Sequence, residues 1–534
     1  MMSSLDGLVK GNAPEDMKII EKLCQDEEKR KLMLKGIYPY EYMDGFESFA
    51  EAGLPPKEEF YSKLSGKGIT EEEYAHVQAV WAAFGCKTLG DYHDLYVKTD
   101  VVLLVDVFEN FRKVCMEKYG LDPAHYYTAP GLSWDVLLKK TGVEMELLTD
   151  LDMHLFIEKG MRGGISMASK RYAKANNSRA ADYDPSKPNK YITYLDANNL
   201  YGWAMSLPLP KGGFKWKRVM PMEEQIMKMK ENSHLGWILE VDLEYPEELH
   251  EAHNSYPLAP EKKFIGAEKM SGYQKRMMED LGLDFPTSEK LVLTLESKEK
   301  YVVHYRNLQL YLKQGMRLKT VHQVLEFDQE RWIEPYIRMI TEFRKEAKSD
   351  FETNFYELMN NSVFGKTMEN LCNRVDVKIV WNWEEEKRRR LTASPSYAGF
   401  HIYVSDLAGI HMHKTRLFLD KPIDTGMTIL ENSKMLMYDF FYNQMKVRYG
   451  EKCELIYTDT DSLLIETDDI YRDMVEDLAL YDTSNYPKDH PVYSGENKKV
   501  LGKMKDECAG RVIAEAVAIR SKMYSIIEEK ENIK

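Results

Sequence analysis

The chain has 534 residues and a mass of 62.3 kDa, which is too long for one compact core and predicts two to four packed units. Hydrophobic residues make up 43% of it and aromatic residues 11%, so an intrinsically disordered protein is excluded. The net charge of −14 by itself disfavours a nucleic-acid partner, so a partner of that kind needs local evidence.

The sequence shows no targeting signal, and its cysteines form no recognisable motif. No basic start precedes an apolar run, and no stretch approaches about 18 consecutive apolar residues, which predicts an intracellular protein without a membrane span. The six cysteines are scattered without a CxxC pair. We therefore expect reduced core thiols, and neither a disulfide framework nor a structural zinc site.

Two segments run against the overall charge. Residues 160–180 and 300–322 each carry five Lys or Arg residues and no acid, and tyrosines lie between them. Basic side chains with interleaved aromatic rings suit a groove that follows a phosphate backbone. Two solvated faces are the simpler interpretation of such runs, so charge alone does not decide the partner.

In chain order, the first elements predict a helical N-terminal part. The first 60 residues are charged and helix-prone, and residues 100–118 place apolar side chains at the spacing of an amphipathic helix. The stretch KYITYLDANNLYGWAM alternates as a strand does and ends at Asp196, where the chain turns. Residues 206–300, rich in Pro and Glu, indicate an insertion with less regular structure.

The second half combines a long helical region with short strands. Residues 318–327 are strand-like, and a helical pattern broken near Ser349–Asp350 covers 332–371. An irregular stretch with the basic run 387–390 follows. Two apolar runs, CELI and LLIE, then predict a β-hairpin with the acidic sequence DTD, residues 459–461, at its turn.

The acidic turn predicts a divalent-metal site. Carboxylates held this close repel each other, so a protein that fixes them at one turn usually has a cation for them. An EF-hand would need further oxygen ligands and a Gly, but Leu463 and Leu464 follow. A lone DxD is most often a solvated turn. Asp196 raises the odds of a site, because three acids together suit two-metal phosphoryl transfer.

The helical sequence NNSVFG, residues 360–365, is a second candidate. The GKT that overlaps its end imitates a phosphate-binding loop, but that loop needs a Gly where Asn360 stands. A helix with Asn361, Phe364 and a bare Gly365 on one face could let a flat base pair slide along it. A half-buried core helix explains the same pattern equally well.

Four sequences together resemble, in order and spacing, the motifs of family B DNA polymerases. DANNLYG, NNSVFG, YTDTDS and the KMY that starts at Lys522 are similar to motifs A, B, C and KxY. Their form and the long insertions resemble the protein-primed branch of viruses and mobile elements, and the likeness runs from about Phe84 to the C-terminus. It implies template-directed DNA synthesis by a nucleotidyltransferase. Two Mg²⁺ or Mn²⁺ ions would be its cofactors, dNTPs and primer–template DNA its partners, and a terminal protein a further candidate partner.

The resemblance also implies roles for single residues. Asp196 and Asp461 would hold the two metal ions with Asp459 beside them, and these three are the candidate catalytic residues. Tyr201 would be the steric gate that stacks under the deoxyribose and excludes a 2′-hydroxyl. The other candidate nucleotide-binding residues are Asn361, Phe364, Gly365 and Lys345. The candidate DNA-binding residues are Lys522, Tyr524, Arg162, Gly163, Gly164, Tyr457 and Ser462.

The fold implied is α+β, a right-hand polymerase with an antiparallel palm sheet, helical fingers, a rudimentary thumb and an N-terminal remnant of an RNase H-like exonuclease. The expected parts are, in order, the truncated exonuclease-like domain (1–120), a connector (121–190), palm with motif A (191–205), an insertion that resembles a terminal-protein-binding region (206–300), palm (301–330), fingers with motif B (331–373), insertion and palm (374–425), palm with motif C (426–500), and the KxY motif with the start of a truncated thumb (501–534).

The N-terminal part departs from the family pattern. Tyr96 and Asp100 resemble the third exonuclease motif, YxxxD, but only 95 residues precede Tyr96 and the other two exonuclease motifs are missing. A residue that starts a helix is the simpler role for Asp100, so we expect no proofreading.

Two further departures concern synthesis itself. Glu357 stands where motif B has a Lys for the triphosphate, and losing such a contact costs about 2–4 kcal/mol of transition-state stabilisation. Arg344, Lys345 and Lys348 are candidate substitutes for that Lys. The chain also stops ten residues after Tyr524, where a thumb is expected. The alternative function is therefore a catalytically impaired remnant that binds primer–template DNA without synthesis.

Overall fold

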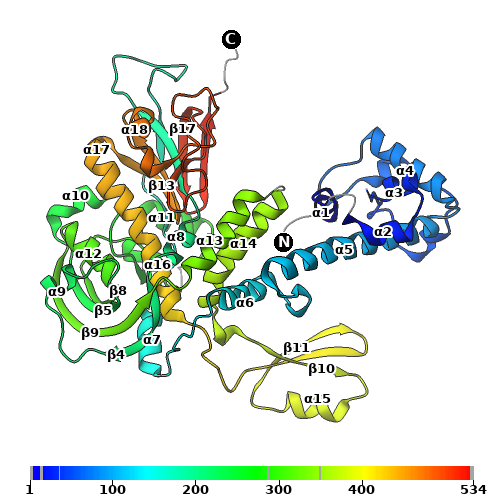
Figure 1. Ribbon diagram of the computed structural model, residues 1–534, viewed down its shortest axis with the longest axis horizontal. Helices are drawn as coiled ribbons and strands as arrows, with labels where there is room; N and C mark the ends of the chain where they lie inside the picture. The colour runs from blue at the N-terminus through cyan, green and yellow to red at the C-terminus, as the bar shows by residue number, and fades with distance from the viewer. Residues whose placement is uncertain (1–3, 13–15, 35, 285–287, 348–349, 530–534) are drawn as a thin grey trace. The chain divides into compact units, whose positions relative to one another are not determined.

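The computed structural model describes residues 4–12, 16–34, 36–284, 288–347 and 350–529 (Figure 1). The chain divides into two compact units, one formed by Met1–Val136 with Glu342–Met359 and the other by Leu137–Thr341 with Asn360–Lys534. Lys348 and the predicted helix break at Ser349 lie outside the described residues.

The first unit is helical. Its longest helix, α5 (Leu89–Tyr119), contains the amphipathic helix predicted over 100–118 and begins earlier, because Thr88 and Asp91 form a capping box. It ends at Gly120, whose φ of 65° is the left-handed conformation typical of helix C-termini. Its other helices include α1 (Leu5–Lys10), α2 (Lys18–Leu23), α3 (Glu27–Met33), α4 (Glu71–Phe84), the first part of α6 (Ala129–Thr141), the end of α13 (Glu334–Glu346) and the first part of α14 (Asp350–Thr367).

A buried carboxylate joins α5 to α2. The two oxygens of Asp106 accept hydrogen bonds of 2.8 Å from the backbone N–H groups of Ile19 and Ile20. These N–H groups lie in the first turn of α2, so Asp106 satisfies donors that the helix itself leaves free. The hydrogen bonds offset the cost of burying the charge.

The residues predicted to form an exonuclease remnant, 1–120, contain helices and no strand in their described part. The described residues of the first unit hold no strand, only a single bridge between Ser62 and Lys67, whereas an RNase H-like fold is built on a central sheet. On α5, burial and hydrogen bonds with Tyr40 and Asp100 raise the pKa of Tyr96. The expectation that Asp100 starts a helix is wrong, because Asp100 lies well inside α5 (Leu89–Tyr119), where it hydrogen-bonds Tyr96.

A six-stranded sheet lies at the centre of the second unit, in the order β1-β13-β14-β3-β16-β15. Its neighbouring strands are antiparallel except β15 and β16, which confirms the predicted antiparallel sheet. The strands are β1 (Ser166–Ala168), β3 (Tyr191–Ala197), β13 (Glu454–Asp459), β14 (Ser462–Thr467), β15 (Tyr481–Asp482) and β16 (Met504–Asp506). The strand that ends near Asp196 and the acidic hairpin are therefore neighbours.

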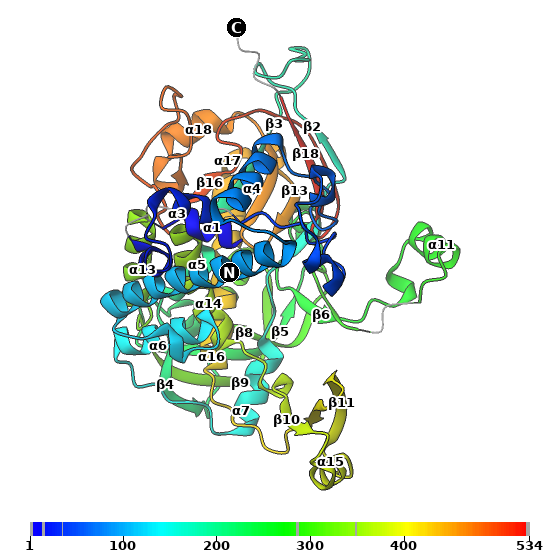
Figure 2. The same ribbon diagram turned by 90° about the vertical axis from the view of Figure 1, so that its right-hand side faces the viewer.

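Both faces of this central sheet are covered. Leu463 and Ile465 pack into a large core with α16 (Ile423–Asp439), and Leu464 packs into a second core with β17 (Ile513–Arg520). Successive side chains of a strand point to opposite faces, so β14 is buried along its whole length. The second cover is a sheet of β2 (Tyr172–Lys174), β17 and β18 (Met523–Glu528), drawn beside β13 in Figure 2.

The region predicted as an irregular insertion instead forms a regular sheet in the order β4-β9-β5-β8. Strand β5 pairs with both β8 and β9, so the sheet continues across the predicted boundary at residue 300. Pro221 and Pro246, which suggested irregular structure, lie between strands, and Pro210 lies in the edge strand β4, where a missing N–H is tolerated. The strands are β4 (Leu209–Trp216), β5 (Leu235–Glu244), β8 (Lys298–His304) and β9 (Arg317–Glu330).

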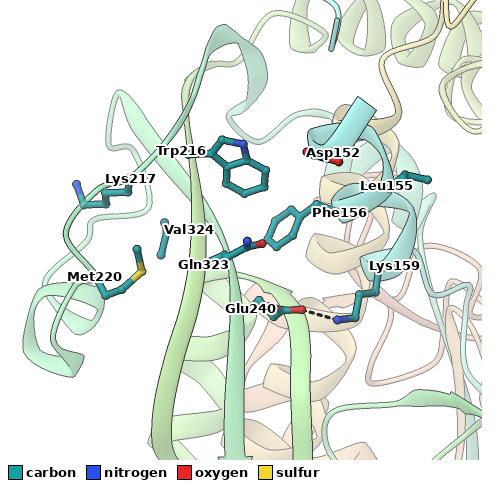
Figure 3. A pocket seen from close by; sticks show the side chains of 10 residues that line it. All are labelled: Asp152, Leu155, Phe156, Lys159, Trp216, Lys217, Met220, Glu240, Gln323 and Val324. Atoms are coloured by element: carbon teal, nitrogen blue, oxygen red, sulfur yellow. Dashed lines mark hydrogen bonds and ion pairs between the residues drawn. The ribbon is translucent and has the colours of Figure 1, made fainter. Parts of the chain in front are cut away.

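A cleft of about 510 Å³ lies between this sheet and α7 (Leu151–Gly160) (Figure 3). Phe156 of the helix and Trp216 of β4 form its apolar part, with ring centroids 5.1 Å apart and an interplanar angle of 84°. An ion pair between Lys159 and Glu240 crosses one end. The cleft therefore combines an apolar surface with a charged rim.

The remaining elements include the predicted helical region. It forms α13 (Glu334–Glu346) and α14 (Asp350–Thr367). The expected irregular stretch after it is a three-stranded sheet in the order β10-β12-β11, made of β10 (Asp376–Trp381), β11 (Tyr397–Val404) and β12 (Leu407–Met412), with the basic run 387–390 in α15 (Glu385–Thr392).

Shorter elements complete the second unit. They are α8 (Leu200–Met205), α9 (Glu223–Met227), α10 (His250–His253), α11 (Gly272–Asp280), α12 (Tyr305–Lys313), α17 (Val447–Tyr449), α18 (Ile470–Glu476), β6 (Glu261–Lys263), β7 (Lys290–Val292) and a π-helical turn over Phe440–Lys446. Within the described ranges, no helix has the length and apolar character needed to cross a membrane.

Candidate active site

One row of residues across the central sheet carries two of the predicted acids. In register, Ser166, Asp459, Ser462, Asp196 and Lys505 stand side by side on β1, β13, β14, β3 and β16. Residues opposite each other in a sheet share a face, so Asp459 and Asp196 lie on the same face with Ser462 between them. Two strand spacings separate their backbones by roughly 10 Å.

The third acid adjoins Asp196. The backbone N–H of Ala197 donates a hydrogen bond of 2.7 Å to the carbonyl oxygen of Asp461, which ties the acidic turn to the end of β3. Asp196 and Asp461 are therefore brought together, and Asp459 lies two strands away from Asp196. In keeping with this spacing, the described part of the chain holds no ready-made group of three His, Cys, Asp or Glu side chains.

The donor chemistry nevertheless suits a divalent cation. Carboxylate oxygens are the ligands that Mg²⁺ and Mn²⁺ prefer, and Mg²⁺ is usually bound by one or two carboxylates together with water and substrate phosphates. Asp196 and Asp461 fit that description, because their backbones are hydrogen-bonded neighbours and both residues are only half-buried.

The acidic turn is tight and is held from outside. Thr460 has a φ of 61°, an unusual conformation for a β-branched residue, and its N–H donates a hydrogen bond of 2.6 Å to the carbonyl of Ile165. A Cβ atom added at Gly164 would lie 2.3 Å from Oγ1 of Thr460 and 2.9 Å from its Cβ. The predicted Gly163–Gly164 motif therefore packs directly against the turn.

Asp459 already has a cation beside it. The Lys522 ammonium lies 3.0 Å from its Oδ2, and this contact raises the pKa of Lys522. Lys522 sits at the β17–β18 turn with a φ of 58°, and its backbone N–H donates to the hydroxyl of Tyr457 at 3.0 Å. The Lys522 side chain is 77% exposed, so water and salt weaken the ion pair.

Three tyrosines connect the KxY motif to the sheet. The ring of Tyr524 stacks on Tyr457 at 4.6 Å, and its hydroxyl donates a hydrogen bond of 3.0 Å to Tyr194. Sequence reasoning missed Tyr194. Strand periodicity could have identified it, because residues two positions apart on a strand point to the same face, so Tyr194 shares a face with Asp196.

The residues predicted to meet the nucleotide form a stacked pair. Tyr201 on α8 lies flat against Phe364 on α14, with ring centroids 4.3 Å apart and an interplanar angle of 13°. Burial raises the pKa of Tyr201 to about 12, and the charges of Asp461 and Asp459 add to the shift. On the same helix Asn361 is exposed, and a Cβ at Gly365 would meet nothing within 4 Å.

Three predicted DNA-binding residues are buried and act as supports. Arg162 donates a hydrogen bond of 2.7 Å to the carbonyl of Val302, and its guanidinium lies 3.8 Å over the ring of Tyr301. Tyr457 and Ser462 are likewise buried within the sheet. Neighbouring residues enclose all three, and their role in DNA binding stays a prediction.

The charge at Glu357 is compensated. Nη2 of Arg344 lies 2.6 Å from Oε2 of Glu357, so an arginine faces this carboxylate. Lys345, the predicted nucleotide-binding residue beside Arg344, pairs with Glu342 at 3.0 Å. An Arg–Glu ion pair between α13 and α14 thus stands where the resemblance led us to expect a single cation.

Gly164→Ala should destabilise the acidic turn. The added Cβ would overlap Thr460, whose branched side chain has little freedom to move, so the free energy of unfolding should fall by about 1–3 kcal/mol. Gly163→Ala is the matched control, because nothing lies within 4 Å of its added Cβ. Urea denaturation of the two variants checks this, and equal stability would show that the close contact is absent.

Lys522→Met should strengthen cation binding at the turn. Removing an exposed ion pair frees the Asp459 carboxylate and should raise Mn²⁺ affinity by up to about fivefold, the size expected for such pairs. Lys452→Met removes an exposed lysine paired with Asp468 at 2.7 Å and serves as the control. Mn²⁺ titration followed by electron paramagnetic resonance measures both, and identical affinities would contradict the expectation.

Comparison with known proteins adds the following. A family model described as DNA polymerase type B, organellar and viral, matches residues 34–445. No curated protein matched the chain. Among solved structures, Phi29 DNA polymerase complexed with primer-template DNA and incoming nucleotide substrates matches with a TM-score of 0.47 and 17% identity, covering 94% of this chain and 68% of that one.

Two other Phi29 structures match similarly. An orthorhombic crystal form gives a TM-score of 0.47 and 17% identity over 93% of this chain and 67% of that one. The complex with single-stranded DNA gives a TM-score of 0.42 and 16% identity, covering 92% of this chain and 65% of that one. The chain thus spans about two thirds of these structures' length. Because the family model covers most of the sequence, the chain belongs to the type B DNA polymerases of organelles and viruses.

Proposed function

We propose that the chain catalyses template-directed addition of deoxynucleotides to the 3′ end of a DNA primer by two-metal phosphoryl transfer. The observation that carries this proposal is the meeting of Asp196, Asp461 and the stacked Tyr201–Phe364 pair near the end of β3. Carboxylate oxygens that can bind metal ions, next to a flat ring surface, suit the binding of a nucleoside triphosphate with its metal ions. These residues come from three distant segments of the sequence, so local structure alone does not explain their meeting.

Asp196 and Asp461 would hold two Mg²⁺ or Mn²⁺ ions. Such ions would lower the pKa of the primer 3′-hydroxyl and stabilise the leaving pyrophosphate. The protein would contribute a rigid backbone that holds the two acids in place. Strand β14 is buried on both faces, and the backbone hydrogen bond from Ala197 keeps the turn against β3, so repulsion cannot drive the two acids apart.

Tyr201 and Phe364 would form the floor under the sugar and the new base pair. The pKa of Tyr201, raised to about 12, keeps its hydroxyl protonated and uncharged near neutral pH. Phe364 holds the Tyr201 ring in place by stacking, and a fixed ring leaves little room for a 2′-hydroxyl. Asn361 and Gly365, on the open part of α14, would meet the nascent base pair.

The DNA strands would lie on the exposed residues around the turn. Lys522 and Tyr524 would contact the primer strand, and the backbone at Gly163 and Gly164 the template. Primer contact would draw the Lys522 ammonium toward phosphate and so release Asp459. The cleft between α7 and the β4–β8 sheet, with its apolar surface and charged rim, suits a protein segment such as a terminal protein.

The alternative is a catalytically impaired remnant that binds primer–template DNA without synthesis. Two observations favour it. Lys522 occupies one acid of the site, and motif B carries the Arg344–Glu357 pair in place of a single cation. Neither affects Asp196 or Asp461, so we rank synthesis first.

Asp461→Asn should abolish synthesis and preserve DNA binding. Loss of one metal-binding carboxylate should slow primer extension at least about 1000-fold, whereas retention of a labelled primer–template should change little. Asp468→Asn, a change at a half-buried ion-paired acid outside the turn, is the control. Extension that survives Asp461→Asn would refute the site. Wild-type protein that retains duplex but never extends it would favour the remnant.

Tyr201→Val should weaken sugar selectivity. Without the ring, a ribonucleotide fits more easily, and the ratio of kcat/KM for dNTP over rNTP should fall by roughly 10- to 100-fold. Tyr273→Val, at a tyrosine that is 64% exposed on α11, controls for loss of a tyrosine elsewhere. An unchanged ratio would remove Tyr201 from the role of steric gate.

A further inference from the structure

A buried ion pair lies on α16. The side chains of Lys434 and Glu431 are 3% and 1% exposed, and the Lys434 ammonium lies 3.3 Å from Oε1 of Glu431. Taking two charges out of water is costly, and a pair of this kind is often no more stable than apolar side chains of similar size. Stability alone therefore does not explain why this pair is in the core.

The Lys434 ammonium also reaches outside its own helix. It donates a hydrogen bond of 3.0 Å to the carbonyl oxygen of Leu430, one helical turn away, and one of 2.9 Å to that of Arg162, which is 272 residues distant in the sequence. Arg162 lies in the segment 160–165, which joins the end of α7 to β1 and contains the Gly163–Gly164 motif. We call this segment the strap.

The strap is fastened at both ends. At its start, a Cβ atom added at Gly160 would lie 2.9 Å from Cγ1 of Val302, so the backbone packs closely against β8. At its end, the carbonyl of Ile165 accepts the hydrogen bond of 2.6 Å from the N–H of Thr460, and Gly164 packs against the side chain of that threonine. The acidic turn is therefore held by the strap, and the strap is held between its ends by the buried lysine.

We propose that Lys434 and Glu431 are positioning residues for the acidic turn. The ammonium fixes the strap, and the strap fixes the turn that carries Asp461. A lysine side chain is flexible, so the Glu431 carboxylate is needed to hold its ammonium at one place. This inference rests on the proposed function for the role of Asp461, and it adds to the site a buried pair from the core of the second unit.

The test needs a variant that loses the contact with the strap and keeps its stability. Lys434→Met alone leaves the Glu431 carboxylate buried without its cation and should be strongly destabilised. Lys434→Met combined with Glu431→Leu removes both charges and keeps side chains of similar size, so urea denaturation should show a stability close to wild type. The matched control is Lys298→Met with Glu261→Leu, which removes another largely buried ion pair, of 2.7 Å, outside α16 and the strap.

Hydrogen–deuterium exchange of the full chain, without DNA, nucleotide or metal, measures how firmly the turn is held. The Thr460 amide should exchange at least about 10-fold faster in the Lys434–Glu431 double variant, while the amides of β14 exchange as in wild type. The control variant should match wild type at both places. Gly160→Ala presses the start of the strap against Val302 and should also speed exchange at Thr460, which keeps the test open if the double variant does not fold. Unchanged exchange at Thr460 overturns the proposal, and so does equally faster exchange throughout β14.

Primer extension separates this proposal from the proposed synthesis. In the double variant kcat should fall about 10- to 100-fold, because a small misplacement of a catalytic group costs that much, whereas the KM for dNTP and the affinity for primer–template change little. If wild-type protein never extends a primer but exchange at Thr460 responds as expected, the synthesis is refuted and the positioning role stands. Extension by the double variant at the wild-type rate overturns the positioning role and leaves the synthesis intact.

Discussion

Repulsion between carboxylates held on one rigid sheet is the constraint on which the site depends. Strand β14 is buried on both faces, so the acids beside it cannot move apart to lower their mutual energy. The chain reduces the repulsion by placing one acid two strands away and by pairing that acid with a lysine. Asp459 lies two strands from Asp196 and is neutralised by Lys522, while Asp461 stays beside Asp196 with its backbone fixed. Asp196 and Asp461 thus stay neighbours, whereas Asp459 is paired with a lysine.

Elements that depend on local pattern could be predicted from the sequence. Three predictions correspond to observed elements: the strand that ends at Asp196, the hairpin around the DTD turn and the helical region 332–371. They could be predicted because the spacing of hydrophobic residues and the identity of turn residues determine structure within a few positions. That the strand ending at Asp196 and the DTD hairpin lie close together was expected from the resemblance of four ordered motifs, and the two are neighbours in one sheet. The family match ends at residue 445, so the role of the acidic hairpin rests on its geometry beside β3.

Features that depend on register between distant strands could not be predicted. The Lys522–Asp459 ion pair joins two turns 63 residues apart, and the contact of Gly164 with Thr460 joins segments almost 300 residues apart. Burial of Arg162, Tyr457 and Ser462 likewise reflects tertiary neighbours. The strand at 318–327 was predicted and corresponds to β9, but its partner strands within 206–300 and the sheet within 374–421 were missed, because prolines and charged residues dominate those stretches of the sequence.

The central claim is that Asp196 and Asp461 form the metal site and that Lys522 yields Asp459 when substrate binds. Anomalous scattering from Mn²⁺, in crystals of the chain with primer–template DNA and a non-hydrolysable nucleotide, tests it most directly. We predict Mn²⁺ between Asp196 and Asp461 and a Lys522 ammonium that has moved from Asp459 to the primer backbone. Mn²⁺ bound elsewhere, or a Lys522–Asp459 ion pair unchanged in the complex, would contradict it.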